Sequence, residues 1–193
     1  MSTYYEGKLL VAPPSMRDWR FKKSVIYLWK HDIAGATGII INKQLESPTF
    51  RDICEESDIE LGEGIDTTVH YGGPINMEIV GCLHTLDYRV DSTNVFDTEL
   101  GFTMDRKCIT DIAHGRGPAQ YIVTMGMASW MAGQLETELE ALPPRSRHES
   151  WLVMDFDPNI MWHSNQREMW NACVNIAVHE QSLNYVDRFF KNQ

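Results

Sequence analysis

The sequence lacks the long apolar segment that a membrane-spanning helix needs. Such a helix takes about 20 consecutive apolar residues, whereas the longest candidate here, residues 38–41, stops at Asn42. The first six residues also lack the basic start and the apolar stretch of a secretory signal peptide. We therefore expect a cytoplasmic protein that does not insert into a membrane.

Closely spaced cysteines are missing as well. The four cysteines of the chain lie far apart in sequence and form no C-x-x-C pair: Cys54, Cys82, Cys108 and Cys173. In a reducing compartment, isolated cysteines are most simply small apolar residues of the core. The sequence predicts four buried thiols rather than a disulfide framework.

Positive charge is scarce, and this argues against nucleic-acid binding. The formal net charge is −10, whereas proteins that bind DNA or RNA neutralise phosphates with Lys and Arg. One local exception has cations and aromatic residues interleaved: Arg17, Trp19, Arg20, Phe21, Lys22 and Lys23. Because such runs are usually solvated loops and no helix-turn-helix pattern accompanies this one, direct nucleic-acid binding is disfavoured.

The motifs of common catalytic sites are incomplete. Gly62-Glu63-Gly64 starts like a dinucleotide-binding loop, but Thr67 occupies the position of the last glycine. The glycine and serine of residues 126–130 do not have the spacing of a hydrolase elbow. We interpret Ser129 as a helix cap.

Metal-binding patterns also fail. Asp155, Asp157 and Asn159 match the start of a calcium loop, but the glycine and the final carboxylate of that loop are absent, so residues 157–159 are interpreted as a turn. His70 and His84 would be neighbours if their strands formed a hairpin, yet no third ligand is evident. The sequence predicts neither a metal site nor a cofactor.

Apolar and β-branched runs predict a mixed α/β fold, with a mixed sheet surrounded by helices in a single domain over residues 1–193. Strands are expected at residues 7–12, 24–30, 37–41, 69–72, 79–86, 120–125 and 150–154, with a short one around Val95-Phe96. Helices are expected to start at Ser47-Pro48, at Thr103 or Asp105, and at Ser164. An apolar stripe of Met131, Leu135, Leu139 and Leu142 predicts another helix, and Leu183, Val186 and Phe190 one further short turn.

Three segments at the ends of strands carry the residues that are hardest to explain as simple core. These are Asn42, the Gly72-Gly73-Pro74 turn, and the segment containing Trp130, Gly133, Gln134 and Glu138. Glycines allow close backbone approach, the two amides donate and accept hydrogen bonds, and the indole offers a rigid apolar wall. We expect the three segments to lie together, either as a site for a ligand or partner or as a structural lock between strands and helices.

The same segments resemble the AlgH/YqgE family of small bacterial proteins, also called UPF0301. The resemblance covers most of the chain and rests on residues 7–13, 21–28, 35–43, 72–74, 130–136, 150–152 and Trp170. It implies an α/β fold with a bifurcated, partly barrel-like mixed sheet, and members are often labelled transcriptional regulators. It supplies no catalytic residue or cofactor. This chain departs from the family at Gln44, where proline is usual, and over residues 184–190.

The sequence therefore favours a non-enzymatic regulatory or adaptor protein that binds a protein partner or a small ligand. The alternative is an enzyme with an unfamiliar site that uses Asn42, Gln134, Glu138 or His70. An enzyme needs a titratable group placed beside a reaction partner, and sequence spacing alone does not establish such proximity.

Overall fold

The structure, a computed structural model, describes residues 4–95, 100–140, 150–163 and 165–191. The chain forms two compact units: unit 1 comprises Met1–Ala36 and Trp130–Gln193, and unit 2 comprises Thr37–Ser129. Strands β3 (Gly35–Ile40) and β8 (Tyr121–Met131) each start in one unit and end in the other. The expectation of one domain over residues 1–193 stays a prediction.

The strands of unit 1 are organised around β1 (Leu9–Val11). It pairs antiparallel with β2 (Val25–Asp32) on one side and with β9 (Leu152–Met154) on the other, so that Leu9 lies opposite both Tyr27 and Met154. All three residues of β1 are fully buried. A continuous apolar run suits this central place because both faces of the strand are covered.

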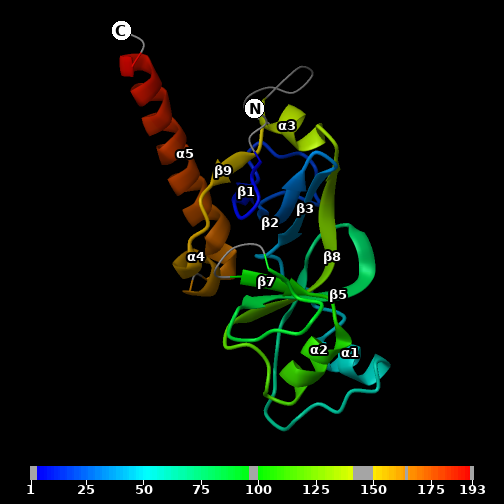
Figure 1. Ribbon diagram of the computed structural model, residues 1–193. Coiled ribbons are helices and arrows are strands. Elements are labelled where there is room, and N and C mark those ends of the chain that lie inside the picture. Colours follow the sequence, from blue (N-terminus) through cyan, green and yellow to red (C-terminus); the bar gives the residue numbers. More distant parts are fainter. Residues whose placement is uncertain (1–3, 96–99, 141–149, 164, 192–193) are drawn as a thin grey trace. The chain divides into compact units, whose positions relative to one another are not determined.

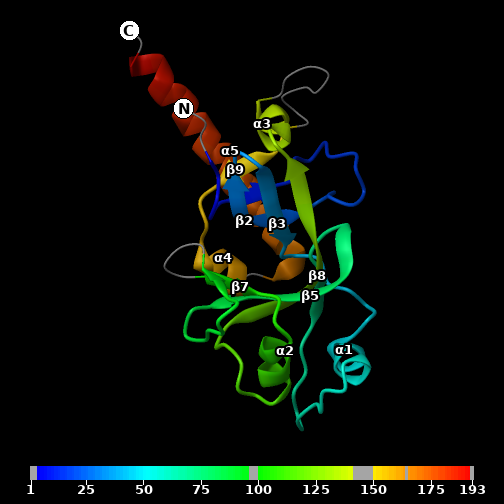
Figure 2. The same ribbon diagram turned by 45° about the vertical axis from the view of Figure 1, so that its right-hand side comes forward.

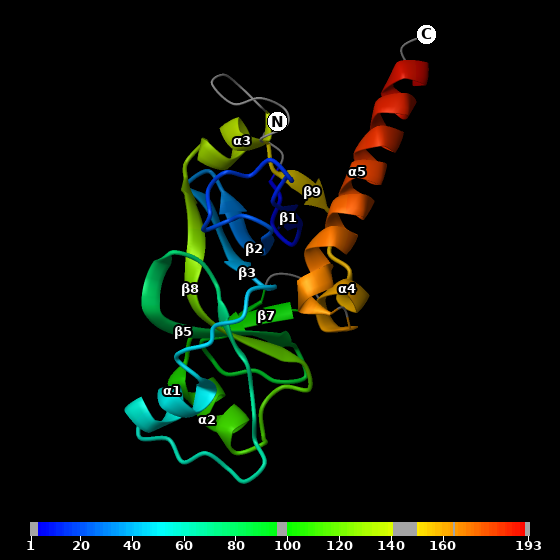
Figure 3. The same ribbon diagram turned by 180° about the vertical axis from the view of Figure 1, so that it is seen from behind.

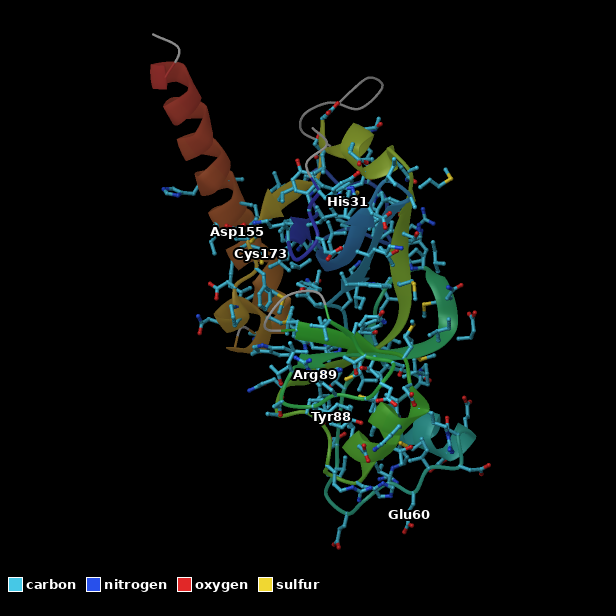
Figure 4. The ribbon with its side chains drawn as sticks, viewed as in Figure 1. His31, Glu60, Tyr88, Arg89, Asp155 and Cys173 are labelled. Carbon is cyan, nitrogen blue, oxygen red and sulfur yellow. The ribbon has the colours of Figure 1, made fainter. Side chains whose placement is uncertain are left out.

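Helix α5 (Gln166–Lys191) packs on these strands, and the short helix α4 (Pro158–His163) packs against α5. Figures 1 and 3 show α5 running beside β9, and Cys173 is labelled on it in Figure 4. Met169, Cys173 and Ala177 recur every four residues and are fully buried, as expected for one face of a helix. The indole N–H of Trp170 donates to the carbonyl oxygen of Ala12 at 2.7 Å and holds the helix to the end of β1.

The strands of unit 2 follow the order β4–β8–β5–β7–β6. Their bounds are β4 Val69–Tyr71, β5 Ile75–Thr85, β6 Asn94–Val95 and β7 Leu100–Thr103. Strand β4 is parallel to β8, whereas β5 is antiparallel to it, so the sheet is mixed as predicted. The hairpin considered for His70 and His84 is wrong, because β8 lies between their strands and pairs His70 with Thr124 and His84 with Tyr121.

Two helices complete the core of unit 2 and lie side by side in Figure 2: α1 (Phe50–Glu56) and α2 (Arg106–Ala113). They bury a shared apolar cluster with β4, β5 and β8, comprising Phe50, Ile53, Cys54, Cys108, Ile109, Ile112, Val69, Cys82 and Val123. Asp105 caps α2, as predicted. Helix α1 starts after Thr49 rather than at Ser47-Pro48, because Thr49 and Asp52 form a reciprocal capping box.

The sequence-based prediction was wrong around residue 130. Strand β8 continues to Met131, so Ser129 lies within a strand and caps no helix, and α3 is limited to Gln134–Leu139. Met131 is 77% exposed and does not join the predicted apolar stripe, while Leu142 lies outside the described residues. Met131 at the end of β8 has helical spacing with Leu135 and Leu139, so the end of the strand imitates a further turn of the helix.

Other local predictions also changed. Pro158 and Asn159 start α4 rather than forming an isolated turn, and Asp157 accepts the backbone N–H of Asn159 just before the helix. Leu183, Val186 and Phe190 continue α5 instead of forming a separate turn. Strand β7 was not predicted, and the expected cap Ser164 lies outside the described residues.

The mixed α/β class is confirmed, and all four cysteines are buried as predicted. Among the described residues, no helix has both the length and the apolar character required to cross a bilayer.

A directed chain of hydrogen bonds crosses the strands of unit 2 at His84. Its Nδ1 lies 2.9 Å from the carbonyl oxygen of Thr85, which only accepts, so Nδ1 carries the proton. Nε2 therefore accepts the hydroxyl of Thr103 at 2.8 Å, and Thr103 in turn accepts from Thr93 at 2.9 Å. Burial lowers the pKa of the His84 imidazole, because the charged form would lose its solvation.

The buried neutral His84 predicts that stability falls in mild acid. The unfolded chain binds a proton at the ordinary histidine pKa of 6.5, while folded His84 resists protonation. Folding free energy is therefore retained above the unfolded pKa and lost as pH decreases below it toward the lowered folded pKa. We expect His84→Asn to flatten this dependence in urea unfolding measured between about pH 7.5 and 5. Equal slopes for wild type and His84→Asn would contradict the assignment.

Candidate functional site

A buried carboxylate lies at the centre of one end of unit 1. Glu138 of α3 is only 8% exposed. Its Oε2 accepts the indole N–H groups of Trp130 at 3.1 Å and of Trp151 at 2.8 Å, and its Oε1 accepts the amide of Gln134 at 3.1 Å. A buried charge is tolerated when such donors surround it. We name Trp130, Gln134, Glu138 and Trp151 the indole–carboxylate cluster.

The aromatic rings of this cluster close the edge of the core. Phe21 packs against Trp130 with 6.5 Å between ring centroids and against Trp151 with 5.7 Å, while the two indoles are 5.9 Å apart. Trp130 and Trp151 are only 5% and 3% exposed. The contacts of Phe21 attach the loop between β1 and β2 to the end of β8.

Gln134 joins the end of β8 to the start of α3. Its Oε1 accepts the backbone N–H of Met131 at 3.0 Å, while its Nε2 donates to Glu138. Gly133 precedes it at φ +74°, a left-handed conformation that favours glycine. Since both ends of the Gln134 amide are used within unit 1, its geometry agrees with the structural lock that was considered from the sequence.

His31 is a second buried polar residue of unit 1, and sequence reasoning did not single it out. The backbone N–H of Tyr5 donates to Nδ1 at 2.9 Å, so Nε2 carries the proton and donates to Glu136 at 3.1 Å. The rings of Tyr4 and Tyr5 pack on the imidazole, which lies at the end of β2 in Figure 4. Both ring nitrogens are engaged, so His31 offers no free nitrogen as a general base. No sequence signal links residues so far apart in the chain.

Asn42 and the Gly72-Gly73-Pro74 turn belong to unit 2. Asn42 lies between two backbone hydrogen bonds that join its segment to the end of β4, from Ile40 N–H to the Gly72 oxygen at 2.9 Å and from Tyr71 N–H to the Lys43 oxygen at 2.8 Å. The structure thus places Asn42 next to Gly72.

The glycines of this turn are required by close backbone contact with β8. A Cβ on Gly72 would lie 2.2 Å from the carbonyl oxygen of Gly126, and one on Gly73 would lie 2.2 Å from the carbonyl carbon of Met127. Gly126 itself has φ +75°, and a Cβ there would lie 2.3 Å from the oxygen of Gly73. No side chain fits at these positions without displacing backbone.

The predicted site residues are therefore divided between the two units. Asn42, Gly72, Gly73 and Pro74 lie in unit 2, whereas Trp130, Gly133, Gln134 and Glu138 lie in unit 1. That the two sets form one site stays a prediction.

A charged cluster in unit 2 surrounds Asp111 of α2. Its carboxylate accepts the hydroxyl of Tyr88 at 2.8 Å and the ammonium of Lys107, with Arg116 at 3.5 Å. Burial raises the pKa of Asp111, but these hydrogen bonds and charges outweigh it and the net shift is downward. Burial, followed by the bond to Asp111, raises the pKa of Tyr88, which Figure 4 labels. Asp111 is thus held as an anion and Tyr88 as a neutral phenol.

Among the described residues, no group of His, Cys, Asp and Glu could hold a metal ion.

Three large apolar side chains of unit 1 are highly exposed on segments that adjoin the indole–carboxylate cluster. Trp19 is 80% exposed, Ile33 is 84% exposed and Met131 is 77% exposed. Trp19 is on the loop that Phe21 attaches to Trp130, and Met131 is the residue after Trp130. Ile33 is two residues from Gly35, where a Cβ would lie 3.1 Å from the carbonyl carbon of Met131. Ile33 and Met131 thus belong to neighbouring segments, and Trp19 belongs to the loop that Phe21 attaches to the end of the same strand.

Cations accompany these apolar side chains. The loop that carries Trp19 has four exposed basic residues: Arg17, Arg20, Lys22 and Lys23. Arg20 pairs with Asp18 at 2.7 Å, and the ammonium of Lys23 lies 5.5 Å from the ring centre of Trp170. We name Trp19, Ile33, Met131 and the four cations the apolar–basic face.

Removal of the Gln134 amide should destabilise the protein. Gln134→Ala leaves the Met131 N–H and one oxygen of Glu138 without their partner, and we expect a loss of about 1–3 kcal/mol in the free energy of unfolding. Thr137→Ala is the matched control, because this exposed residue of the same helix loses only a bond to the Gly133 oxygen. Chemical denaturation of both variants measures the difference. An unchanged stability in Gln134→Ala would favour a ligand-binding role for the amide instead.

Comparison with known sequences places the chain in a family. The AlgH-like family model, DUF179, matches residues 9–180. A UPF0301 protein of Jannaschia sp. is 36% identical over 171 residues, which cover 87% of this chain and 85% of that protein. One from Rhodospirillum rubrum is 34% identical over 172 residues, covering 89% and 86%.

Solved structures agree with the sequence comparison. The solution structure of AlgH from Pseudomonas aeruginosa is similar with a TM-score of 0.73 at 28% identity, covering 91% of this chain and 89% of that chain. A crystal structure of a protein from Corynebacterium diphtheriae has a TM-score of 0.66 at 21% identity, covering 89% and 86%, and shares the fold. The chain belongs to the AlgH-like, UPF0301 family, as its strand and turn motifs indicated.

Proposed function

We propose that this protein is a non-enzymatic regulatory adaptor of the cytoplasm, which binds a protein partner through the apolar–basic face of unit 1. The observation that carries the proposal is the exposure of Trp19, Ile33 and Met131, each more than three-quarters open to solvent on segments that adjoin the end of β8. Tryptophan and methionine are enriched in the buried centres of protein interfaces. Exposed apolar residues that are grouped in this way indicate an interaction surface more than scattered ones do.

The charge of the face selects the chemistry of the partner. Four cations lie beside Trp19 on a protein whose formal net charge is −10. A partner segment with acidic and apolar residues would place its apolar side chains on Trp19 and Met131 and its carboxylates on the loop. Complementary charges of this kind raise association rates and exclude partners of the wrong sign.

The polar residues of unit 1 support binding rather than catalysis. The carboxylate of Glu138 holds two indoles and an amide, and both nitrogens of His31 are occupied. A catalytic acid or base needs a lone pair or a proton that can reach a substrate. The enzyme considered from the sequence, with Asn42, Gln134 and Glu138 at its site, lacks a supporting observation of this kind.

A regulatory effect on transcription would then pass through a bound protein and not through DNA. The negative charge opposes phosphate binding, and four cations on one loop give only a small electrostatic contribution. We expect no sequence-selective binding to duplex DNA at sub-micromolar concentration and physiological salt. Fluorescence anisotropy with promoter fragments measures this, and tight selective binding would overturn the proposal.

Site-specific crosslinking tests the face directly. A photoreactive amino acid at position 19 or 131 should crosslink a protein segment that is rich in Asp and Glu, identified by mass spectrometry. Arg17→Glu combined with Lys22→Glu should abolish that crosslink, because both substitutions reverse the charge that faces the partner. The matched control is the same photoreactive residue at Val95, which is 45% exposed in unit 2.

Two outcomes would contradict the adaptor proposal. One is an identical set of crosslinked proteins from positions 19, 131 and 95, which would indicate random collision. The other is a crosslinked segment that is basic or that survives the double charge reversal. Circular dichroism of each variant confirms that its fold is intact, which is expected because the substituted residues are exposed.

A further inference from the structure

Unit 2 has a cavity of about 570 Å³ that the proposed adaptor role does not use. It is lined by residues from the start of α1 and from the loop that precedes β4: Thr49, Phe50, Arg51, Leu61, Gly64, Ile65, Asp66 and Thr67. Its volume lies within the range of about 300–1,000 Å³ that is typical of sites for small molecules.

Two opposite charges line this cavity without forming an ion pair. Arg51 comes from α1, and Asp66 comes from the loop. Within the part of the chain that the structure describes, neither side chain forms a hydrogen bond or a salt bridge with another residue. This separates them from Asp52, which is held in the capping box, and from Asp111, which is held by three donors.

The remaining walls of the cavity are apolar and anchored. Phe50 belongs to the core cluster of unit 2, and Leu61 and Ile65 pack against that cluster. Thr67 is held by a 2.8 Å hydrogen bond with the hydroxyl of Tyr121 on β8. Walls fixed in this way give the cavity a preformed apolar side, which reduces the ordering that binding requires.

We infer that the cavity binds a free α-amino acid with an apolar side chain. The guanidinium of Arg51 binds the carboxylate, a group whose geometry it matches with two parallel donors. The carboxylate of Asp66 binds the ammonium group. The apolar side chain contacts Leu61 and Ile65. A ligand that carries both charges satisfies both protein groups at once, whereas a simple anion or cation would leave one of them unmatched.

The inference is tested by titrating isotope-labelled protein with leucine and with phenylalanine, followed by amide NMR. Shifts should be confined to residues 49–51 and 61–67. N-acetyl-leucine lacks the ammonium and leucinamide lacks the carboxylate, and each should bind at least about 10-fold more weakly, the effect of losing one charged hydrogen bond. Equal binding of the blocked compounds, or no shifts at these residues, would overturn the inference.

Two variants assign the charges. Arg51→Gln should remove the preference for leucine over leucinamide, and Asp66→Asn should remove the preference for leucine over N-acetyl-leucine. Glu63→Gln is the matched control, because this exposed carboxylate of the same loop does not line the cavity. If Arg51 and Asp66 pair with each other in solution, both variants lose stability and neither changes the ligand preference, which would also overturn the inference. The crosslinking at unit 1 is unaffected by any of these results.

Discussion

The need to satisfy the buried carboxylate of Glu138 governs the structure of unit 1. An ionised group shielded from water costs several kcal/mol unless donors replace the lost solvent. Here the donors are two indoles and one amide. Because they come from the end of β8, from α3 and from the residue before β9, one carboxylate fixes three segments at once. Phe21 then attaches the β1–β2 loop to the same rings.

This inward use of polar groups explains why the surface, and not a cleft, is the functional candidate in unit 1. Trp130, Gln134 and Glu138 are occupied with each other, whereas Trp19, Ile33 and Met131 are highly exposed. Unit 2 has the opposite arrangement beside α1. There, Arg51 and Asp66 line a cavity, and neither forms a hydrogen bond or a salt bridge within the described residues. The family relationship is compatible with both roles and specifies neither.

Sequence patterns located most strands because burial on one or both faces leaves a local signature in the order of residues. They failed where a strand and a helix follow each other without a polar loop. Residues 126–131 belong to β8, although Met131 has the spacing of a helical stripe with Leu135 and Leu139. The glycine turn at residue 72 was recognised, but not its cause. Only the fold shows that the oxygen of Gly126 occupies the place of a Cβ.

The sequence by itself determined the mixed α/β class, the buried cysteines, the negative net charge and the family, because these depend on composition and on motifs of neighbouring residues. The tertiary structure decided which residues meet. Trp151 is thirteen residues from Glu138, and His31 is over a hundred residues from Glu136. Spacing at that range carries no periodic signal, since the contact depends on strand pairing and chain reversal. For the same reason, only the fold shows that the Gln134 amide bonds to both Met131 and Glu138.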